Sequence, residues 1–224
     1  MKVRFFFLVI AMLTLSSCAG YHFNTNNNPL IGYDIHSVAV PMFINRSVLP
    51  DLTGPMTREI TLALSDYSGL KVLSGNNEKA DAVLIGIIDS SDHYNEVVRT
   101  TQNLFTGTDK KIKPSIGNRS DFYYPVETSY TLSLKVILII RPSAEELMLA
   151  QSDLNKFIDV NPKVVLMDTL NLSGSFSRVA SEAVNSSSAG KTNFVKNKGI
   201  FEKSLHETAL KAAESFKQVV LNAF

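Results

Sequence analysis

Cys18 is the single cysteine of the chain, and the residues before it give its thiol a specific chemical setting. Lys2 and Arg4 form a positive start, an apolar run covers residues 5–13, and two serines come directly before the cysteine. This charged, apolar, small order is typical of a secretory signal, and the run is too short to cross a bilayer core of about 30 Å as a helix. Small residues let an extended chain enter a peptidase, so the sequence predicts cleavage before Cys18 and a thiol free for acylation.

A second candidate for chemistry is a group of four cations within ten residues of the loop-like stretch 101–124. Its members are Lys110, Lys111, Lys113 and Arg119. Near a membrane edge, such a group would hold phosphates through charge-assisted hydrogen bonds. The alternative interpretation is an ordinary solvated loop, and the sequence leaves both open.

The sequence offers little for catalysis or for a metal. The four histidines, at positions 22, 36, 93 and 206, are scattered, and none has the spacing of a metal-binding pair. No G-x-S-x-G motif marks a nucleophilic serine. Residues 189–192 look like the end of a phosphate-binding loop, but Asn185 stands where that motif requires glycine. We therefore expect no enzyme activity, no metal and no cofactor; an envelope hydrolase is the least favoured alternative.

Composition predicts one domain held together by its core alone. One cysteine excludes a disulfide framework and a thiolate metal site. Loss of Lys2 and Arg4 with the signal leaves 20 basic against 21 acidic residues, a balance that argues against generic binding to nucleic acid. No later stretch approaches the ~18 apolar residues of a membrane helix. We expect a signal peptide over residues 1–17, a lipidated polar tether over 18–34 and a single domain over 35–224.

Periodicity predicts two long helices on a sheet of about four strands. One helix is expected from Asp51, as N-cap, to about Tyr67, and another over residues 201–223; each carries an apolar stripe at helical spacing. Strands are expected at residues 35–43, 70–73, 82–89, 126–140 and 164–178. Two amphipathic helices need an apolar surface, and one mixed sheet supplies it. The expected fold is a two-layer α/β (α+β) sandwich.

Three segments add detail to this pattern. Ser143 and Glu146 have capping-box spacing before an apolar stripe, so an inserted helix is expected near residues 143–157. Residues 181–199, rich in Ser, Asn and Gly, are expected to form a mobile loop. Along the last two strands, apolar residues alternate with polar ones, which should give each strand one polar face. These polar residues are Thr131, Ser133, Lys135, Asn171, Ser173 and Ser175.

Several blocks resemble known families. Leu15-Ser16-Ser17-Cys18 resembles the lipobox of bacterial lipoproteins, which implies N-acyl (palmitate) and S-diacylglycerol lipid on Cys18. Residues 18–23 (CAGYHF) are similar to the start of the lipopolysaccharide-assembly lipoproteins, the LptE family, with Ala19 as an extra residue. Residues 35–47, 50–52 and 62–64 resemble that family's strand, loop and first helix. Residues 80–88 resemble its strand of an acidic residue and an apolar run with glycine.

The LptE resemblance implies two helices on one mixed sheet and a role without catalysis. Such a lipoprotein sits in the outer membrane, lipid-anchored and facing the periplasm or inside a barrel lumen. It plugs and helps assemble an LptD-like β-barrel partner and assists insertion of lipopolysaccharide at the cell surface. Contact of lipopolysaccharide with Lys110, Lys111, Lys113 and Arg119 is our hypothesis from charge alone. The alternative function is a lipoprotein adaptor of another envelope secretion or efflux machine.

Overall fold

The structure is a computed structural model of the 224-residue chain. It describes residues 27–77, 79–106, 121–152, 154–160, 163–179 and 189–221. The predicted signal peptide and Cys18 lie outside the described residues, as do the four cations Lys110, Lys111, Lys113 and Arg119 and residues 181–188 of the expected loop.

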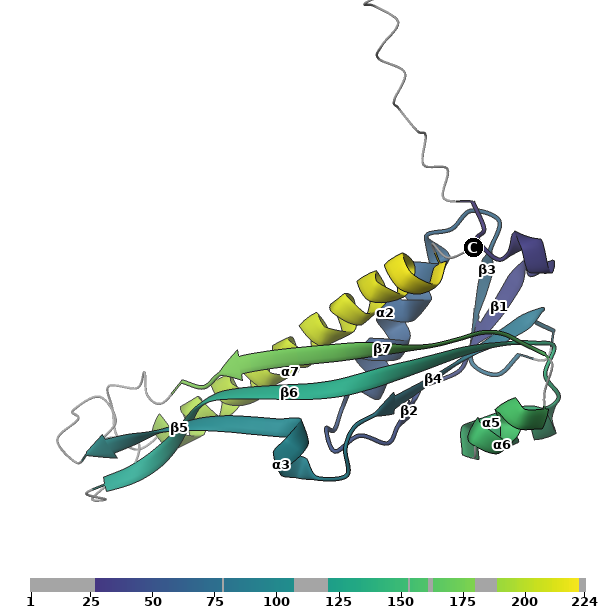
Figure 1. The fold of residues 1–224 in the computed structure, drawn as a ribbon. Coiled ribbons are helices and arrows are strands. Elements are labelled where there is room, and N and C mark those ends of the chain that lie inside the picture. The colour runs from purple at the N-terminus through teal and green to yellow at the C-terminus, as the bar shows by residue number, and fades with distance from the viewer. Residues whose placement is uncertain are drawn as a thin grey trace, which may run out of the picture.

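One mixed sheet runs through the described part of the molecule (Figure 1). Its seven strands are β1 (Ser37–Val40), β2 (Ile44–Asn45), β3 (Lys71–Ser74), β4 (Ala82–Asp89), β5 (Val98–Thr106), β6 (Asp121–Ile140) and β7 (Val164–Ser177). The order is β3-β1-β4-β6-β5, with β2 also beside β4 and β7 also beside β6. Pairs among β1 to β4 are parallel, and β6 is antiparallel to β4, β5 and β7. The predicted α/β class is confirmed, but four strands were too few.

The 20 residues of β6 make the sheet elongated. The second half of β6 pairs with β4 and the first half pairs with β5, both along the same edge of β6. β7 pairs along the opposite edge of β6. We call β5, β6 and β7 the blade; it projects away from β1 and β3 (Figure 1). The loop expected over 101–124 is wrong at both ends, because β5 continues to Thr106 and β6 begins at Asp121. Pro125 is tolerated inside β6 because it pairs beside the register shift between Thr101 and Gln102.

Two long helices cover one face of the sheet, as predicted. They are α2 (Thr53–Ser65) and α7 (Ala189–Ser215), which continues as the short π-helix η3 (Phe216–Val220). Their apolar stripes are buried with the facing strand residues in one core. The buried helix residues include Met56, Ile60, Leu64, Leu205, Ala209 and Phe216.

Two helix starts differ from prediction. Leu52, not Asp51, is the N-cap of α2, because Leu52 is buried in the core while exposed Asp51 takes the left-handed conformation that aspartate tolerates (φ 61°). The mobile loop expected to residue 199 is wrong from Ala189 onward, since α7 begins there. Asn197 helps to hold this first part of α7 in place. Its amide oxygen accepts from the N–H of Val179 (2.8 Å), and its Nδ2 donates to the Val179 carbonyl (3.1 Å). These bonds join the helix to the end of β7.

A smaller layer lies on the opposite face of the sheet. It consists of α5 (Ala144–Ser152) and α6 (Leu154–Val160), two helices where one was expected. Leu147, Ala150, Leu154 and Phe157, the predicted stripe, form a second core with residues of β1, β4 and β6. The capping box forms: the Ser143 N–H donates to the Glu146 carboxylate (2.7 Å), and the Glu146 N–H donates to Ser143 Oγ (3.2 Å). The shorter helices η2 (Ile31–Tyr33) and α3 (Tyr94–Val97) complete the described elements.

Two glycines let aromatic rings lie flat on the helix-covered face of the sheet. A Cβ on Gly86 of β4 would lie 2.4 Å from the Phe43 ring, and a Cβ on Gly174 of β7 would lie 2.3 Å from Tyr130. The Tyr130 hydroxyl then reaches α7, where it is 2.9 Å from both Ser204 Oγ and Thr208 Oγ1. Tyr130 thereby fastens α7 to the blade.

Candidate functional site: the uncovered face of the blade

One face of the blade is covered by α7. On the other face, α5 and α6 cover only the end that holds Ile137 and Ile139 of β6, and no described helix covers the rest. Side chains of successive strand residues point to opposite faces, so the alternation along β6 and β7 sends apolar residues toward α7 and polar residues outward. We call the outward set the hydroxyl face. Its uncharged members are Ser129, Thr131, Ser133, Thr169, Asn171, Ser173 and Ser175; the charged residues Glu127 and Lys135 of β6 and Arg99 of β5 lie on the same side of the sheet.

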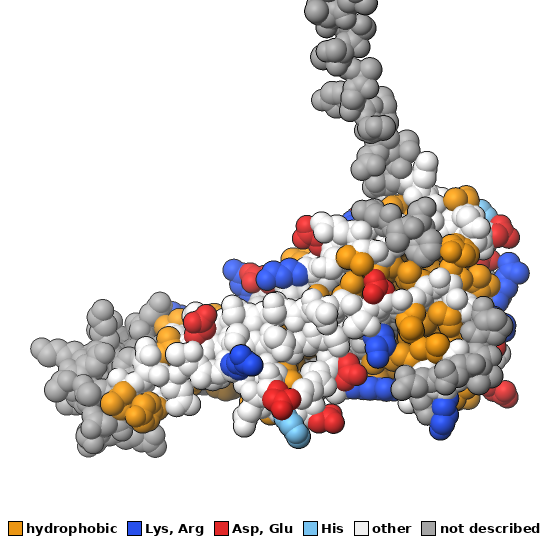
Figure 2. All heavy atoms as spheres, in the orientation of Figure 1, with side chains coloured by type: hydrophobic (Ala, Val, Ile, Leu, Met, Phe, Trp, Pro, Cys, Tyr) orange, Lys and Arg blue, Asp and Glu red, His pale blue; other side chains and the backbone are white. Residues whose placement is uncertain are grey.

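The hydroxyl face consists of matched rows on two neighbouring strands. Ser129 pairs with Ser175, Thr131 with Ser173, and Ser133 with Asn171. Figure 2 looks onto the blade from this side and shows a broad surface of uncharged polar side chains and backbone, with single charged side chains on it and at its margin. The sequence predicted the polarity of these positions, and the register of β6 with β7 brings them together.

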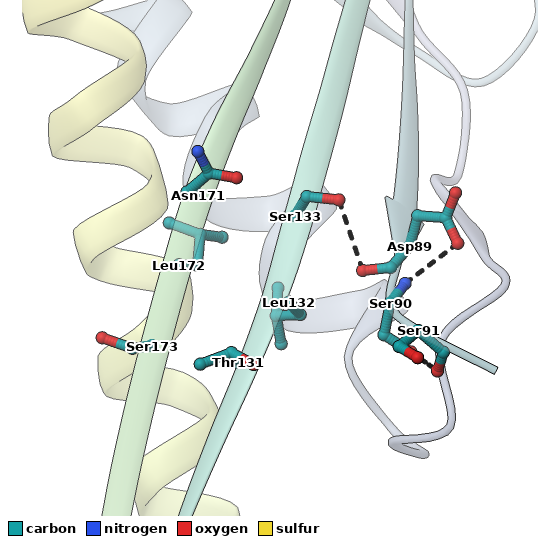
Figure 3. Close-up of a pocket in the computed structure, with 9 residues that line it drawn as sticks. All are labelled: Asp89, Ser90, Ser91, Thr131, Leu132, Ser133, Asn171, Leu172 and Ser173. Atoms are coloured by element: carbon teal, nitrogen blue, oxygen red, sulfur yellow. Dashed lines mark hydrogen bonds between the residues drawn. The ribbon is translucent and has the colours of Figure 1, made fainter. Parts of the chain in front are cut away.

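The hydroxyl face is hollowed where β4 ends beside it (Figure 3). The hollow has a volume of about 560 Å³; Thr131, Ser133, Asn171 and Ser173 form its floor, and residues 89–91 form a wall. Ser133 Oγ donates to the Asp89 carbonyl (3.4 Å), and the Ser90 N–H donates to the Asp89 carboxylate (2.9 Å). Asp89 is the last residue of β4, as the sequence analysis predicted.

The side chains of this surface are suited to forming hydrogen bonds with a partner. Hydroxyl and amide groups both donate and accept, so they match partners that carry neutral polar groups. The described residues that line the hollow include no histidine, lysine or cysteine; the one carboxylate among them, Asp89, accepts a hydrogen bond from the Ser90 N–H. Among the described residues, no three His, Cys, Asp or Glu side chains come together as a metal site would require. Within the same residues, no helix has both the length and the apolar character needed to span a bilayer.

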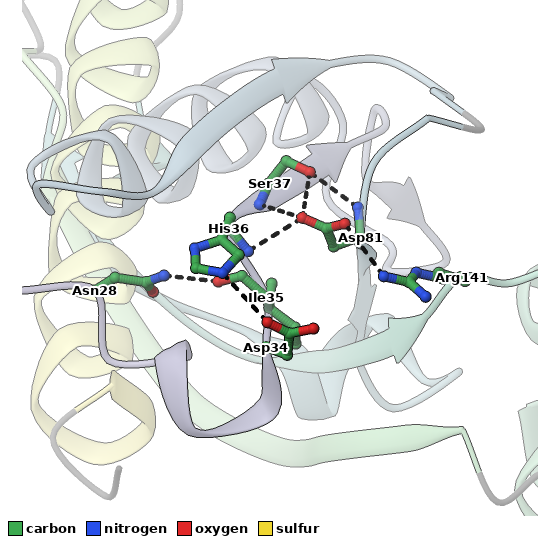
Figure 4. A network of polar contacts seen from close by, with 7 residues as sticks. All are labelled: Asn28, Asp34, Ile35, His36, Ser37, Asp81 and Arg141. Atoms are coloured by element: carbon green, nitrogen blue, oxygen red, sulfur yellow. Dashed lines mark hydrogen bonds and ion pairs between the residues drawn. The ribbon is translucent and has the colours of Figure 1, made fainter.

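The polypeptide enters the domain through a polar network at the opposite end from the blade tip (Figure 4). Asn28 is buried: its Nδ2 donates to the Ile35 carbonyl (2.6 Å), and its Oδ1 accepts from the Leu30 N–H (2.9 Å). Leu30 packs into the main core. The tether expected to extend to residue 34 is therefore too long, because Asn28 and Leu30 already fix the chain to the domain.

Asp81 joins the start of β1 to the start of β4 in this network. One carboxylate oxygen accepts from Ser37 Oγ (2.7 Å), the Ser37 N–H (2.9 Å) and the His36 N–H (3.1 Å). Arg141 lies 3.7 Å from the other oxygen. The Ser37 hydroxyl, then the two backbone N–H groups and the Arg141 charge, hold the pKa of Asp81 below its usual value, although burial acts in the opposite direction. This is the acidic residue of the block 80–88 quoted above.

The comparisons with known proteins give only remote structural similarity. No family model and no curated protein matches the sequence. A candidate lipoprotein from Caulobacter crescentus is similar at a TM-score of 0.40 and 8% identity, over 81% of this chain and 88% of that one. Rare lipoprotein B from Shewanella oneidensis is similar at a TM-score of 0.35 and 10% identity, over 83% of this chain and 95% of that one. Lipoprotein GNA1162 from Neisseria meningitidis is similar at a TM-score of 0.33 and 13% identity, over 75% of this chain and 96% of that one. Similarity at this level transfers no partner or ligand to this chain.

Proposed function

We propose that the protein is a lipid-anchored envelope lipoprotein without catalytic activity, and that it works in the outer membrane as a subunit of the lipopolysaccharide translocon. In this proposal the blade enters the lumen of a large LptD-like β-barrel, plugs it and helps it assemble. Lipopolysaccharide then passes the occupied lumen on its way to the cell surface. Cys18 carries the lipid, and no metal or other cofactor takes part.

The observation that carries the proposal is the hydroxyl face. Antiparallel sheets commonly leave one polar face uncovered. On this one, rows of uncharged side chains fill the middle, and Glu127 and Lys135 stand at the two ends of the β6 row. Large membrane barrels enclose a polar, water-filled interior. Rows of serine, threonine and asparagine would bind such a wall through hydrogen bonds without burying an unpaired charge.

The position of the N-terminus supports the same arrangement. Eight residues lie between Cys18 and Asn27, so even a fully extended chain places Asn27 no more than about 30 Å from the lipidated residue. Asn28 and Asp81 then fix the chain at the end of the domain formed by β1 and β3. The anchored end would remain at the membrane surface, while the blade points away from it.

The test is a pull-down of the tagged, lipidated protein in mild detergent, with mass spectrometry of the co-purifying proteins. We expect one large outer-membrane β-barrel protein at one-to-one stoichiometry. The Cys18→Ser variant, which lacks the anchor, is the matched control and should recover much less of it. Recovery of a secretion or efflux component instead would replace the translocon by the adaptor function.

A further inference from the structure

A half-open cavity lies between α7 and the covered face of the blade. Its volume is about 520 Å³, within the range of small-molecule sites. Its walls are largely apolar and aromatic: Leu49, Tyr94, Phe176, Phe194 and Phe201 line it. Two of these lining residues are strongly exposed to solvent: Tyr94 is 58% exposed and Phe194 is 69% exposed. The described residues thus leave an aromatic-lined space between them.

The charges around the cavity have one sign. Arg178 and Lys198 line it, and none of the described lining residues is acidic. The Arg178 guanidinium is half-buried, lies 4.6 Å from the centre of the Phe176 ring and donates to Thr128 Oγ1. No carboxylate of the described residues forms an ion pair with it. Among the described residues, the ion pair of Lys198 is an exposed contact with Glu202 at 3.7 Å, and pairs of this kind are weak.

We propose that this cavity binds the alkyl chain of an anionic amphiphile, with a carboxylate or phosphate headgroup between Arg178 and Lys198. The aromatic walls would remove the alkyl chain from water, and the two cations would select against neutral and cationic heads. A free fatty acid and an acyl phospholipid share this chemistry. The inference does not depend on a barrel partner. A negative pull-down would therefore leave the ligand proposal standing, and a negative binding test would leave the barrel proposal standing.

The test uses a dansyl-labelled fatty acid with the full mature chain carrying Cys18→Ser, because a detergent-free sample is needed. We expect saturable binding, seen as a rise in dansyl fluorescence. Palmitate and lysophosphatidate should displace the probe, and hexadecanol and cetyltrimethylammonium should not. Stronger displacement by palmitate would identify a free fatty acid as the ligand, and stronger displacement by lysophosphatidate would identify a phosphate headgroup.

Two pairs of variants of α7 separate the cavity from general surface effects. Phe194→Ser should weaken probe binding about tenfold, whereas Val195→Ser, at a residue 62% exposed that does not line the cavity, should leave it unchanged. Lys198→Gln should weaken it about threefold. Lys203→Gln, which removes an equivalent exposed contact with Glu207 at 3.7 Å, should have no effect. Absence of probe binding, equal effects within either pair, or equal displacement by the cationic amphiphile would overturn the proposal.

Discussion

Gly174→Ala tests how α7 is attached to the blade. Gly174 lies on β7 beneath the ring of Tyr130, its cross-strand partner on β6. An added methyl group would lie 2.3 Å from Tyr130 Cζ and 2.6 Å from Thr208 Oγ1, both far inside van der Waals contact. The Tyr130 side chain is only 1% exposed, so the ring has no route into solvent. The ring, the helix or the strand must therefore move.

The expected cost follows from these contacts. Overpacking a well-packed core typically costs about 1–3 kcal/mol. Displacement of the Tyr130 hydroxyl adds about 1 kcal/mol, because its single proton is donated to either Ser204 or Thr208, whose own hydroxyls donate to backbone carbonyls. The sum, about 2–4 kcal/mol, would lower Tm by about 10 °C in a domain of this size. Tyr130→Phe, which removes only the hydroxyl, should cost about 1 kcal/mol, since Ser204 and Thr208 keep backbone carbonyl acceptors.

The assay is urea unfolding followed by far-ultraviolet circular dichroism, because the chain has no tryptophan. The matched control is Gly199→Ala, the same substitution at an exposed position inside α7 with open space around it. Alanine should stabilise the helix there by up to about 1 kcal/mol, so the two variants should change the free energy of unfolding in opposite directions. A Gly174→Ala protein as stable as the wild type would show that the Tyr130 ring does not lie over Gly174.

Three further predictions concern the ends of the molecule and its charges. Asp81→Asn should cost about 1–3 kcal/mol at pH 7. Because the folded state lowers the pKa of Asp81, this stabilisation is present above a pH of about 4 and is lost as the pH falls through the folded value. The free energies of unfolding of the wild type and the variant should converge in acid. A difference between them that persists at low pH would show that the ionised carboxylate does not cause the stabilisation. Cys18→Ser should give a folded protein absent from the outer-membrane fraction; continued membrane association would refute lipidation. Joint charge reversal at Lys110, Lys111 and Lys113 should weaken lipopolysaccharide binding without changing Tm, and unchanged binding would make that loop ordinary solvated surface.

Much of the fold could be predicted from the sequence because its signals are local. The stripes of α2 and α7 and the alternation along β6 and β7 follow from side-chain periodicity, and the bounds of β4 follow from an almost uninterrupted apolar run. The capping box of Ser143 and Glu146 formed as its spacing indicated. The polarity of the hydroxyl face was also visible, since Thr131, Ser133 and Asn171 stand at alternating positions.

The features that escaped prediction depend on contacts between distant segments. The part of β5 from Thr101 to Thr106 was expected to be a loop, and only its pairing with β6 identifies it as a strand. The first turns of α7 are held through Asn197, whose partner Val179 lies 18 residues away. The cavity lined by Phe194, Arg178 and Tyr94 is assembled from three separate elements. No local pattern marks any of these three features.

Site-specific photo-crosslinking in the native envelope tests most directly whether the blade lies inside a barrel. A photoreactive residue at Ser173, in the middle of the hydroxyl face, should give a strong adduct with a single outer-membrane β-barrel protein. The same residue at exposed Lys71 of β3, at the anchored end, should give little of that adduct. Equal adducts from both positions, or none from Ser173, would contradict the proposed insertion of the blade.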